Sequence, residues 1–390
     1  MVAGMTFRFL MALSPLALLA ASCGSPAAGD STKPAAAEVK DQFKVEVLGT
    51  FDEPWAMVLL PGTSMLFLTE KAGTIKFIDS AANRQGTVTG IPKVDYGGQG
   101  GLGEIAFLGS ESASTVSRRT IFLTWVEAGR DGTRGAALGK GTMICEEADA
   151  CRIDGLQVIW RQDPKVSGRG HFSHRIAFSP DGKYLFVSSG ERQKFTPAQD
   201  LSNNLGKVLR LNLDGTPAAG NPFADKGGVS AQIWSYGHRN LLGLQFDASG
   251  QLWGLEHGPA GGDELNRIEP GKNYGWPLVS DGDNYDGTPI PRNSTRPDLA
   301  QPAISWNPVI APGDFIFYSG KMWPEWKGQA LIAGMGYPGL VRVKIDGEKA
   351  REEARYPLGH RIREIREAPD GSLLLLEDGK GGRLLQLTRK

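Results

Sequence analysis

Residues 174–191, HRIAFSPDGKYLFVSSGE, followed by residues 206–215, GKVLRLNLDG, form the stretch that decides the fold. Apolar and aromatic residues alternate with polar ones in three short runs, and Pro-Asp-Gly and Asp-Gly turns separate or end the runs. Short alternating runs bounded by such turns predict antiparallel β-strands. The stretch therefore predicts three consecutive strands of one sheet.

The same unit recurs along the chain at intervals of roughly 45 to 75 residues, which is typical of a repeat fold. The other copies are WAMVLLPGTSMLFLTE with GTIKFID from Trp55, GEIAFL with RRTIFLTWVE from Gly103, NLLGLQFDASGQLWGLEHG with DELNRI from Asn240, DFIFYSGKMWPEWKGQALIAGMG with GLVRVKIDG from Asp314, and RIREIREAPDGSLLLLEDG with GRLLQLT from Arg361. Six copies predict an all-β chain folded as a six-bladed β-propeller, whereas a pair of β-sandwiches would show no such recurrence. We expect Phe43 to Leu48 to add a strand to the last blade.

The balance of charges limits the classes of partner. Lysine and arginine total 43, and aspartate and glutamate also total 43, so the net charge is zero. A nucleic-acid-binding protein or one that binds an acidic membrane surface usually has a basic excess. We therefore expect functional charge to be local, around a small molecule.

The first residues predict a targeting segment. Arg8 precedes an apolar stretch, Phe9 to Ala21, that is too short to span a bilayer as a helix. The residues before Cys23 resemble a lipobox, so we expect residues 1–23 to be a lipoprotein-type signal, residues 24–41 a flexible tether and residues 42–390 the propeller. The alternative is an ordinary cleaved signal. Both imply export, and the lipid on Cys23 would be the only membrane contact of a periplasmic or outer-membrane-anchored protein.

Two cysteines remain beyond Cys23. Cys145 and Cys151 are close in sequence, and an oxidising compartment favours a small local disulfide. A metal pair is the alternative, but no other soft ligands flank these two residues.

The richest polar segment is Ile233 to Pro277. It contains Arg239-Asn240, the turn Glu256 to Pro259, Asp263-Glu264, and Asn273 to Trp276. Carboxylate and carbonyl oxygens suit Ca²⁺, and a guanidinium beside an amide suits a carboxylate or quinone oxygen. The alternatives are solvated turn charges and a structural arginine.

Three further motifs carry side chains that a ligand could use. His171 in HFSHRIAF is a candidate general base, although a lone histidine is more often structural. Gln99 is a single amide among glycines in DYGGQGGLGEIAF, which is either a ligand contact or a plain turn. Arg361 and Arg363 alternate in RIREIRE and should share one face of a strand, either clamping an anion or protecting a sheet edge.

Taken in order, these motifs resemble those of the soluble, pyrroloquinoline quinone (PQQ)-dependent aldose sugar dehydrogenases. The resemblance extends from Pro54 to the C-terminus and rests on PWAMVLLPG, GQGGLGEIAF, QDPKVSGRGHFSHRIAF, AQDLSNNLGKVLRLNLDG, IWSYGHRN, EHGPAGGDELN, KNYGWP and RIREI. It implies a six-bladed propeller with PQQ and Ca²⁺ as cofactors. The implied reaction oxidises an aldose to a lactone by hydride transfer to the quinone, with a further acceptor taking the electrons.

The resemblance also implies roles for individual residues. His171 is similar to the base that takes the proton of the anomeric hydroxyl, and Arg239 matches a PQQ contact that would also polarise the quinone. The carbonyls of Gly258 and Pro259 match ligands of the cofactor calcium. The remaining matches are contacts of PQQ (Gln99, Asn240, Tyr285, Arg361 and Arg363) and of a second calcium (Glu264 and Tyr274).

Two positions depart from the family pattern. Gly336 stands where the family usually has a lysine near the quinone oxygens, and no lysine lies within five residues. His174 is an addition beside the candidate base. We hypothesise that His174 or a shifted cation compensates for the missing lysine.

Two other functions compete with this interpretation. A calcium-dependent hydrolase of the lactonase type would need several carboxylates around one metal at the channel centre, and this chain offers mostly carbonyls and cations. A surface propeller without turnover is the other alternative, and Gly336 motivates it.

Overall fold

The structure is a computed structural model that describes residues 42–79, 84–114, 118–147 and 149–390. The predicted signal, Cys23 and the predicted tether lie outside the described residues. In the described part, strands β1 to β24 alternate with turns and short 3₁₀ segments, with no α-helix. No helix of these ranges is long and apolar enough to cross a membrane. The predicted all-β class is confirmed.

Most strands form four-stranded antiparallel groups. One eight-stranded sheet contains β2 (Pro54–Leu59), β3 (Met65–Glu70), β4 (Thr74–Asp79) and β5 (Arg84–Thr89), followed in pairing order by β9 (Ala150–Arg161), β8 (Arg134–Ile144), β7 (Arg118–Ala128) and β6 (Leu102–Phe107). Its two halves are antiparallel groups that join through a parallel pairing of β5 with β9.

The other groups are separate sheets. They are β10 (Ser173–Phe178), β11 (Tyr184–Ser189), β12 (Lys207–Asn212) and β13 (Ile233–Tyr236); β14 (Leu241–Phe246), β15 (Leu252–Glu256), β16 (Asp263–Ile268) and β17 (Ile304–Trp306); and β18 (Pro312–Phe317), β19 (Ala330–Gly334), β20 (Gly339–Asp346) and β21 (Lys349–Pro357). The short 3₁₀ segments are Gly109–Glu111, Thr196–Gln199, Ala224–Lys226, Gly228–Gln232, Asn293–Thr295 and Pro324–Trp326.

The last sheet joins the two ends of the described chain. It contains β22 (Ile362–Glu367), β23 (Leu373–Glu377), β24 (Lys380–Arg389) and β1 (Phe43–Asp52). Strand β1 pairs antiparallel with β24, from Phe43 opposite Arg389 to Asp52 opposite Lys380. This pairing confirms the strand addition predicted for Phe43 to Leu48.

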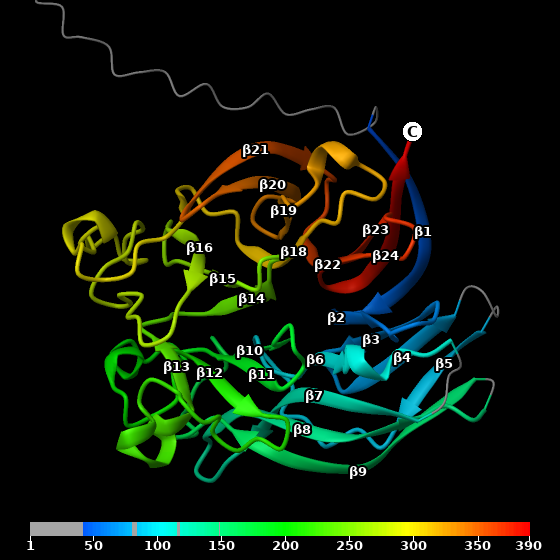
Figure 1. Cartoon of the computed structure of the whole chain (residues 1–390), viewed down its shortest axis with the longest axis horizontal. Coiled ribbons are helices and arrows are strands. Elements are labelled where there is room, and N and C mark those ends of the chain that lie inside the picture. Colours follow the sequence, from blue (N-terminus) through cyan, green and yellow to red (C-terminus); the bar gives the residue numbers. More distant parts are fainter. Residues whose placement is uncertain (1–41, 80–83, 115–117, 148) are drawn as a thin grey trace, which may run out of the picture. The chain divides into compact units, whose positions relative to one another are not determined.

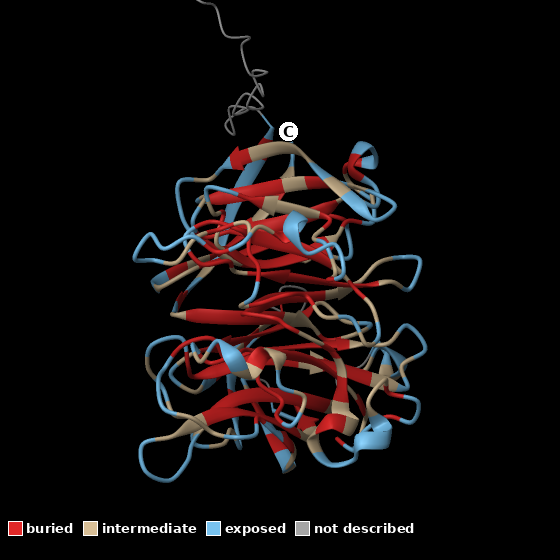
Figure 2. Ribbon diagram, turned by 90° about the vertical axis from the view of Figure 1, so that its left-hand side faces the viewer, coloured by how far each residue is buried: buried red, intermediate tan, exposed pale blue. Residues whose placement is uncertain are grey.

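The sheets surround a common centre (Figure 1). The first strands of the groups contact one another in the order β2, β6, β10, β14, β18 and β22, and β22 contacts β2. These strands are almost entirely buried, and the exposed residues gather in the connecting loops (Figure 2). Burial on both faces agrees with the largely apolar sequences of β2 (PWAMVL) and β14 (LLGLQF), whereas β10 (SHRIAF) and β22 (IREIRE) carry charged residues toward the centre. The arrangement is consistent with a β-propeller.

The buried Arg175 and the partly buried Arg366 connect the first strands at the centre. Arg175 on β10 donates from Nε to the Leu242 carbonyl of β14 (2.7 Å) and from Nη2 to the Gly313 carbonyl of β18 (2.8 Å). Its Nη1 lies 2.9 Å from Glu104 of β6 and 2.7 Å from Glu364 of β22. One guanidinium therefore contacts four neighbouring first strands.

Arg366 on β22 supplies the remaining connections. It donates to the Met57 carbonyl of β2 (3.1 Å), pairs with Asp314 of β18, and lies 2.6 Å from Glu364. We call Glu104, Arg175, Asp314, Glu364 and Arg366 the central ion cluster. Three carboxylates thus do meet at the centre, contrary to the expectation of mostly carbonyls and cations, but guanidinium groups pair with all three.

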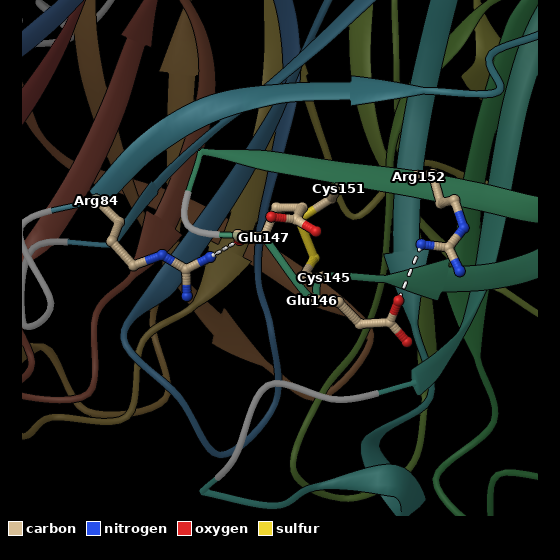
Figure 3. Close-up of a disulfide and its surroundings, with 6 residues drawn as sticks. All are labelled: Arg84, Cys145, Glu146, Glu147, Cys151 and Arg152. Atoms are coloured by element: carbon tan, nitrogen blue, oxygen red, sulfur yellow. Dashed lines mark hydrogen bonds and ion pairs between the residues drawn. A yellow bond between two sulfur atoms is a disulfide. The ribbon is translucent and has the colours of Figure 1, made fainter.

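A disulfide joins the end of β8 to the start of β9. Cys145 and Cys151 are bonded across a sequence separation of six residues, and both side chains are buried. Figure 3 shows two flanking contacts: Arg152 pairs with Glu146 at 3.1 Å, and Arg84 donates to the Glu147 carbonyl. The structure therefore contains a disulfide between the two predicted cysteines, and it closes the β8–β9 turn.

Candidate functional site

The predicted site residues lie at one edge of the sheets. Gln99, His171 and Arg239 precede the first strands β6, β10 and β14, and Arg361 precedes β22. Because the first and second strands of each group are antiparallel, the start of one and the end of the next meet at the same edge. The ends of β3, β11, β15, β19 and β23 therefore also contribute residues to this edge.

A cavity of about 180 Å³ opens at this edge. Its lining includes four predicted PQQ contacts, namely Gln99, Asn240, Arg361 and Arg363. The other lining side chains are Trp55, Lys71, Phe172, Ser173, His174, Leu242, His257 and Met335. The structure thus brings together polar groups from several sheets around one space, which we call the main cavity.

His171 lies beside the main cavity and forms a pair with Glu191, the second residue after β11. His171 Nδ1 bonds to the Glu191 carboxylate, and the backbone N–H of His171 donates to Gln99 Oε1 at 2.7 Å. Since an ionised carboxylate only accepts, Nδ1 carries the proton and Nε2 keeps a lone pair. Among the described residues, Nε2 has no hydrogen-bond partner.

Burial sets the charge states of this pair. It lowers the pKa of His171 more than the bond to Glu191 raises it, and the positive charge of Arg239 lowers that pKa further. Burial opposes the charge on Glu191, but hydrogen bonds from His171 and from the backbone of Phe195 hold its pKa below the ordinary value. A neutral imidazole oriented by a carboxylate anion is the arrangement required of a general base.

Glu191 also holds the loop that follows it. Its carboxylate accepts backbone N–H groups of Gln193 (2.9 Å), Lys194 (2.5 Å) and Phe195 (2.6 Å). Gln193 and Phe195 have φ values of 59° and 62°, in the left-handed region that non-glycine residues rarely adopt. One side chain thus fixes both the imidazole and a strained loop next to it.

Gln99 reaches the cavity through a glycine-rich loop. Its backbone N–H donates to the Arg169 carbonyl at 2.8 Å. Gly98 has φ +60°, and a Cβ there would lie 2.7 Å from the same carbonyl. The glycine is therefore needed for this close approach.

Arg361 and Arg363 share one partner. Asp378, just after β23, accepts from Arg361 Nε at 2.9 Å and from Arg363 Nη2 at 2.6 Å. The common partner confirms that both side chains lie on one side of the strand. It also means that one negative charge already offsets part of their positive charge.

His174 is fully buried beside Trp55, Thr124 and Arg175. Its ring stacks on Trp55 with centroids 4.9 Å apart and planes 10° apart, and its Nδ1 lies 2.8 Å from Thr124 Oγ1. Gly103 leaves room for this ring, because a Cβ there would lie 2.0 Å from it. Burial lowers the pKa of His174 to about 3, so the ring is neutral. This finding speaks against the hypothesis that His174 substitutes for a cation.

Arg239 lines a second, smaller cavity and is not among the residues that line the main cavity. It donates to the His257 carbonyl at 3.1 Å and to the Tyr285 hydroxyl at 3.2 Å, while its backbone N–H donates to Glu256. Its Nε is buried without a hydrogen-bond partner among the described residues. Tyr285 is 77% exposed, so the structure places it at the rim rather than in the lining. Asn240, in contrast, reaches the main cavity and accepts a hydrogen bond from Ser173.

The smaller cavity, about 20 Å³, is lined by oxygen-bearing residues that include Glu256, Gly258, Glu264 and Tyr274. This volume suits one water molecule or ion. Burial raises the pKa of Glu264 to about 8, and the nearby charge of Glu256 adds to the effect. Glu256 bonds to His238 and Glu264 to the amides of Asn266 and Asn293, and two carboxylates buried this close together fit a site for Ca²⁺. No cluster of three histidine, cysteine or acidic side chains able to hold a metal occurs within the described ranges.

The predicted calcium ligands differ in how well they fit this cavity. The Tyr274 hydroxyl donates to the Arg267 carbonyl and accepts from the Glu269 N–H, so only the main-chain carbonyl of Tyr274 remains for a cation. Pro259 is buried in the same turn but is not among the lining residues. Gly258 and Glu264 line the cavity.

Sequence reasoning missed several residues of the site. Trp55 begins a recognised strand motif and Lys71 directly follows the end of that motif, but no spacing marks either as a cavity residue. Glu191 and Asp378 follow the ends of β11 and β23, at the edge where the site was expected. The rule that site residues gather at this edge could have found both.

Comparisons with known proteins agree with this geometry. The family model described as Glucose / Sorbosone dehydrogenase matches residues 51–386. The chain is 36% identical to aldose sugar dehydrogenase YliI of Escherichia coli K12 over 351 residues, which cover 88% of this chain and 92% of that protein.

Two solved structures are also similar. The apo-form of the soluble aldose sugar dehydrogenase of Escherichia coli has a TM-score of 0.82 at 34% identity, covering 89% of this chain and all of that one. The PQQ-bound aldose sugar dehydrogenase of Streptomyces coelicolor has a TM-score of 0.70 at 27% identity, covering 92% of this chain and all of that one.

Proposed function

Because this chain belongs to the glucose/sorbosone dehydrogenase family, we propose that it oxidises aldose sugars to lactones with PQQ as the bound hydride acceptor. Membership of the family makes the protein an oxidoreductase of the sugar dehydrogenase class. PQQ is the cofactor that the Streptomyces relative binds. We also propose that the sheets form a six-bladed propeller, which is supported by the cyclic contacts of the first strands.

The observation that carries this proposal is the main cavity beside the His171–Glu191 pair. PQQ combines a quinone with three carboxylates and, when bound, supplies the hydride acceptor. Arg361 and Arg363 offer guanidinium groups to carboxylates, while Gln99 and Asn240 offer amides. The residues of the cavity therefore fit an anionic, oxygen-rich cofactor.

We propose that His171 is the general base. Its Nδ1 proton is held by Glu191, so Nε2 is the atom that would accept the proton of the sugar's anomeric hydroxyl. Glu191 would then stabilise the imidazolium that forms. A positioned base of this kind contributes about 10²–10⁴ in rate.

We further propose that Ca²⁺ binds in the smaller cavity and in the adjoining turn. Glu264 and the carbonyls of Gly258 and Tyr274 are the candidate ligands from the lining, and Pro259 lies in the same turn. A divalent cation here would neutralise Glu256 and Glu264 and stabilise the turn next to Arg239.

Localisation is a separate proposal. We propose that the protein is exported and anchored through a lipid on Cys23. Replacing Cys23 with serine should move the protein from the membrane fraction to the soluble fraction. Its persistence in the membrane fraction would exclude a lipid anchor at this residue.

One experiment tests the proposed function. The purified apo-protein is mixed with PQQ and Ca²⁺, and dye reduction is measured with a panel of aldoses. We expect sugar-dependent reduction and lactone formation. Absence of PQQ binding would reject the proposal, and binding without turnover would indicate a non-catalytic propeller. Lactone hydrolysis without dye reduction would indicate a hydrolase.

A further inference from the structure

Lys71 is a cation in the main cavity to which no role has been assigned. It follows the last residue of β3 and lines the cavity together with Gln99, Arg361 and Arg363. Its side chain is 15% exposed. An ammonium group so enclosed differs from the solvated lysines of the surface.

The backbone of Lys71 is held from both sides. Its N–H donates to the Glu53 carbonyl at 3.1 Å, and its carbonyl accepts from the Leu102 N–H at 2.9 Å. Gly101 permits this second contact, because a Cβ at Gly101 would lie 2.2 Å from the Lys71 carbonyl oxygen. The position of the residue is therefore fixed relative to the glycine-rich loop that carries Gln99.

Two acceptors orient the ammonium group of Lys71. Nζ donates to the Gly98 carbonyl at 3.0 Å and lies 3.4 Å from Glu53 Oε1. The Tyr96 hydroxyl also bonds to Glu53, and the Tyr96 ring lies 5.8 Å from Nζ. Because an ammonium has three donors and two acceptors bind it within the described residues, one donor remains for a ligand.

The ion pair of Lys71 is also longer than the ion pairs of the neighbouring arginines. Asp378 lies 2.9 Å from Arg361 and 2.6 Å from Arg363, whereas Glu53 lies 3.4 Å from Lys71. An anion in the cavity would therefore find a partly free ammonium on the wall formed by β3 and the Gln99 loop. Charge-assisted hydrogen bonds of this type are the strong ones.

We propose that Lys71 is a cofactor-binding residue whose ammonium group donates a charge-assisted hydrogen bond to a carboxylate oxygen or a quinone carbonyl oxygen of the bound quinone. This inference rests on the proposed function, since it requires PQQ in the main cavity. A purely structural role would need only the bonds to Gly98 and Glu53. That role predicts a loss of stability in a Lys71 variant but no loss of affinity for PQQ.

The test measures PQQ affinity of the apo-protein in Ca²⁺ by equilibrium dialysis, without relying on activity. We expect Lys71→Met to raise the Kd about 10- to 100-fold, as the loss of one hydrogen bond to a charged group implies. Lys71→Arg should retain most of the affinity. Lys71→Gln, which can still donate to Gly98, serves if the methionine variant does not fold, and it should also bind more weakly.

Lys76→Met is the matched control. Lys76 lies on β4, pairs with Glu70, is 36% exposed and does not line the cavity. The affinity of the Lys76→Met variant for PQQ should equal that of the wild type. Unchanged affinity in Lys71→Met and Lys71→Gln, or an equal loss in Lys76→Met, would overturn the inference while leaving the proposed function intact. Failure of the wild type itself to bind PQQ would overturn both.

Discussion

His171 and Glu191 show how burial selects charge states at the scale of single residues. The histidine is neutral because burial lowers its pKa, and the glutamate is ionised because four hydrogen bonds hold its charge. The same carboxylate fixes the left-handed backbone of Gln193 and Phe195. Such strain persists only where the surroundings determine it strongly, and it concentrates at functional sites.

Glu191→Gln should separate orientation of the base from binding of the cofactor. The amide no longer stabilises an imidazolium, so we expect kcat to fall by about 10²–10⁴ with little change in the Kd for PQQ. Steady-state dye reduction and a PQQ titration measure the two quantities. In the wild type, kcat should stay constant to below pH 6.5, because burial lowers the pKa of His171. An unchanged kcat in the variant would remove Glu191 from the mechanism.

His174 predicts a pH dependence of stability. Its pKa is about 3 in the folded protein, against an ordinary value of 6.5, so between these values the unfolded chain binds the extra proton. The free energy of unfolding therefore falls as pH falls through this range. Between pH 7 and pH 5 the wild type should lose about 2 kcal/mol more than His174→Gln, as the linkage relation requires. Urea unfolding at both pH values measures the free energy of unfolding. If the wild type and His174→Gln lost equal amounts of it, His174 would not be neutral and buried in the folded protein.

Some of these residues could be predicted from sequence and others could not. His171, Gln99, Asn240 and the arginines stand in ordered motifs, and the structure places them in or beside one cavity. Lys71 and Asp378 escaped prediction because their roles depend on which strands are neighbours in space. Tyr285 was expected in the pocket, yet it lies at the rim, since the long loop before β17 carries it outward.

At the scale of elements, the inner strands were easier to predict than the outer ones. Strands such as β15, β19 and β23 are apolar runs ended by turns, because both faces are buried. The outermost strands β5 (RQGTVT) and β21 (KAREEARYP) are largely polar and partly exposed, so alternation marks them poorly. Pairing with an inner neighbour, rather than their own composition, makes them strands.

The disulfide between β8 and β9 should stabilise this turn measurably. Replacing both Cys145 and Cys151 with alanine should lower the free energy of unfolding by about 2 kcal/mol, the value expected for so short a loop. Chemical denaturation measures the change, and the wild type under reducing conditions should show a similar loss. Equal stability of the oxidised wild type and the variant would show that the bridge contributes nothing to folding.

Calcium should stabilise the turns around Glu264. Binding only to the folded state raises the free energy of unfolding, by about 2.7 kcal/mol at 100 times the Kd. We therefore expect the melting temperature to rise with Ca²⁺ and to fall with a chelator. Glu264→Gln should reduce this response, whereas Glu348→Gln, at a side chain that is 81% exposed, should not. If Ca²⁺ raised the melting temperature of the wild type, Glu264→Gln and Glu348→Gln equally, the ion would bind elsewhere.

At the scale of the whole described unit, the central ion cluster connects the first strands that surround the centre. Arg175 of β10 bonds to β6, β14, β18 and β22, and Arg366 of β22 bonds to β2, to β18 and to Glu364 of its own strand. Buried charges without partners are costly, so the cluster is stable only when all its members are present. We infer that it fixes the strands relative to one another beneath the Trp55 side of the main cavity, where Arg175 lies 4.1 Å from the Trp55 ring.

Arg175→Met should therefore be severely destabilising. Removing one partner from a buried cluster leaves Glu104 and Glu364 without it, and such losses cost about 3–5 kcal/mol. Arg118→Met provides the control, because its pair with Asp154 is on the surface and the two side chains are 62% and 63% exposed. Chemical denaturation should show almost no change in the control. If the free energy of unfolding of Arg175→Met fell as little as that of the control, the cluster would not hold the strands together.

The pairing of β1 with β24 places residues 43–52 beside residues 380–389, so the first described strand has its partner at the far end of the chain. A ribosome synthesises residue 43 long before residue 389 exists. Until then β1 has no partner, and its exposed Val45 and Val47 leave apolar surface on an unpaired edge. The last sheet can therefore be completed only after residues 380–389 have been synthesised. A nascent chain that stops short of β24 would expose this edge to other chains. The main consequence of such a truncation would be aggregation rather than loss of catalysis.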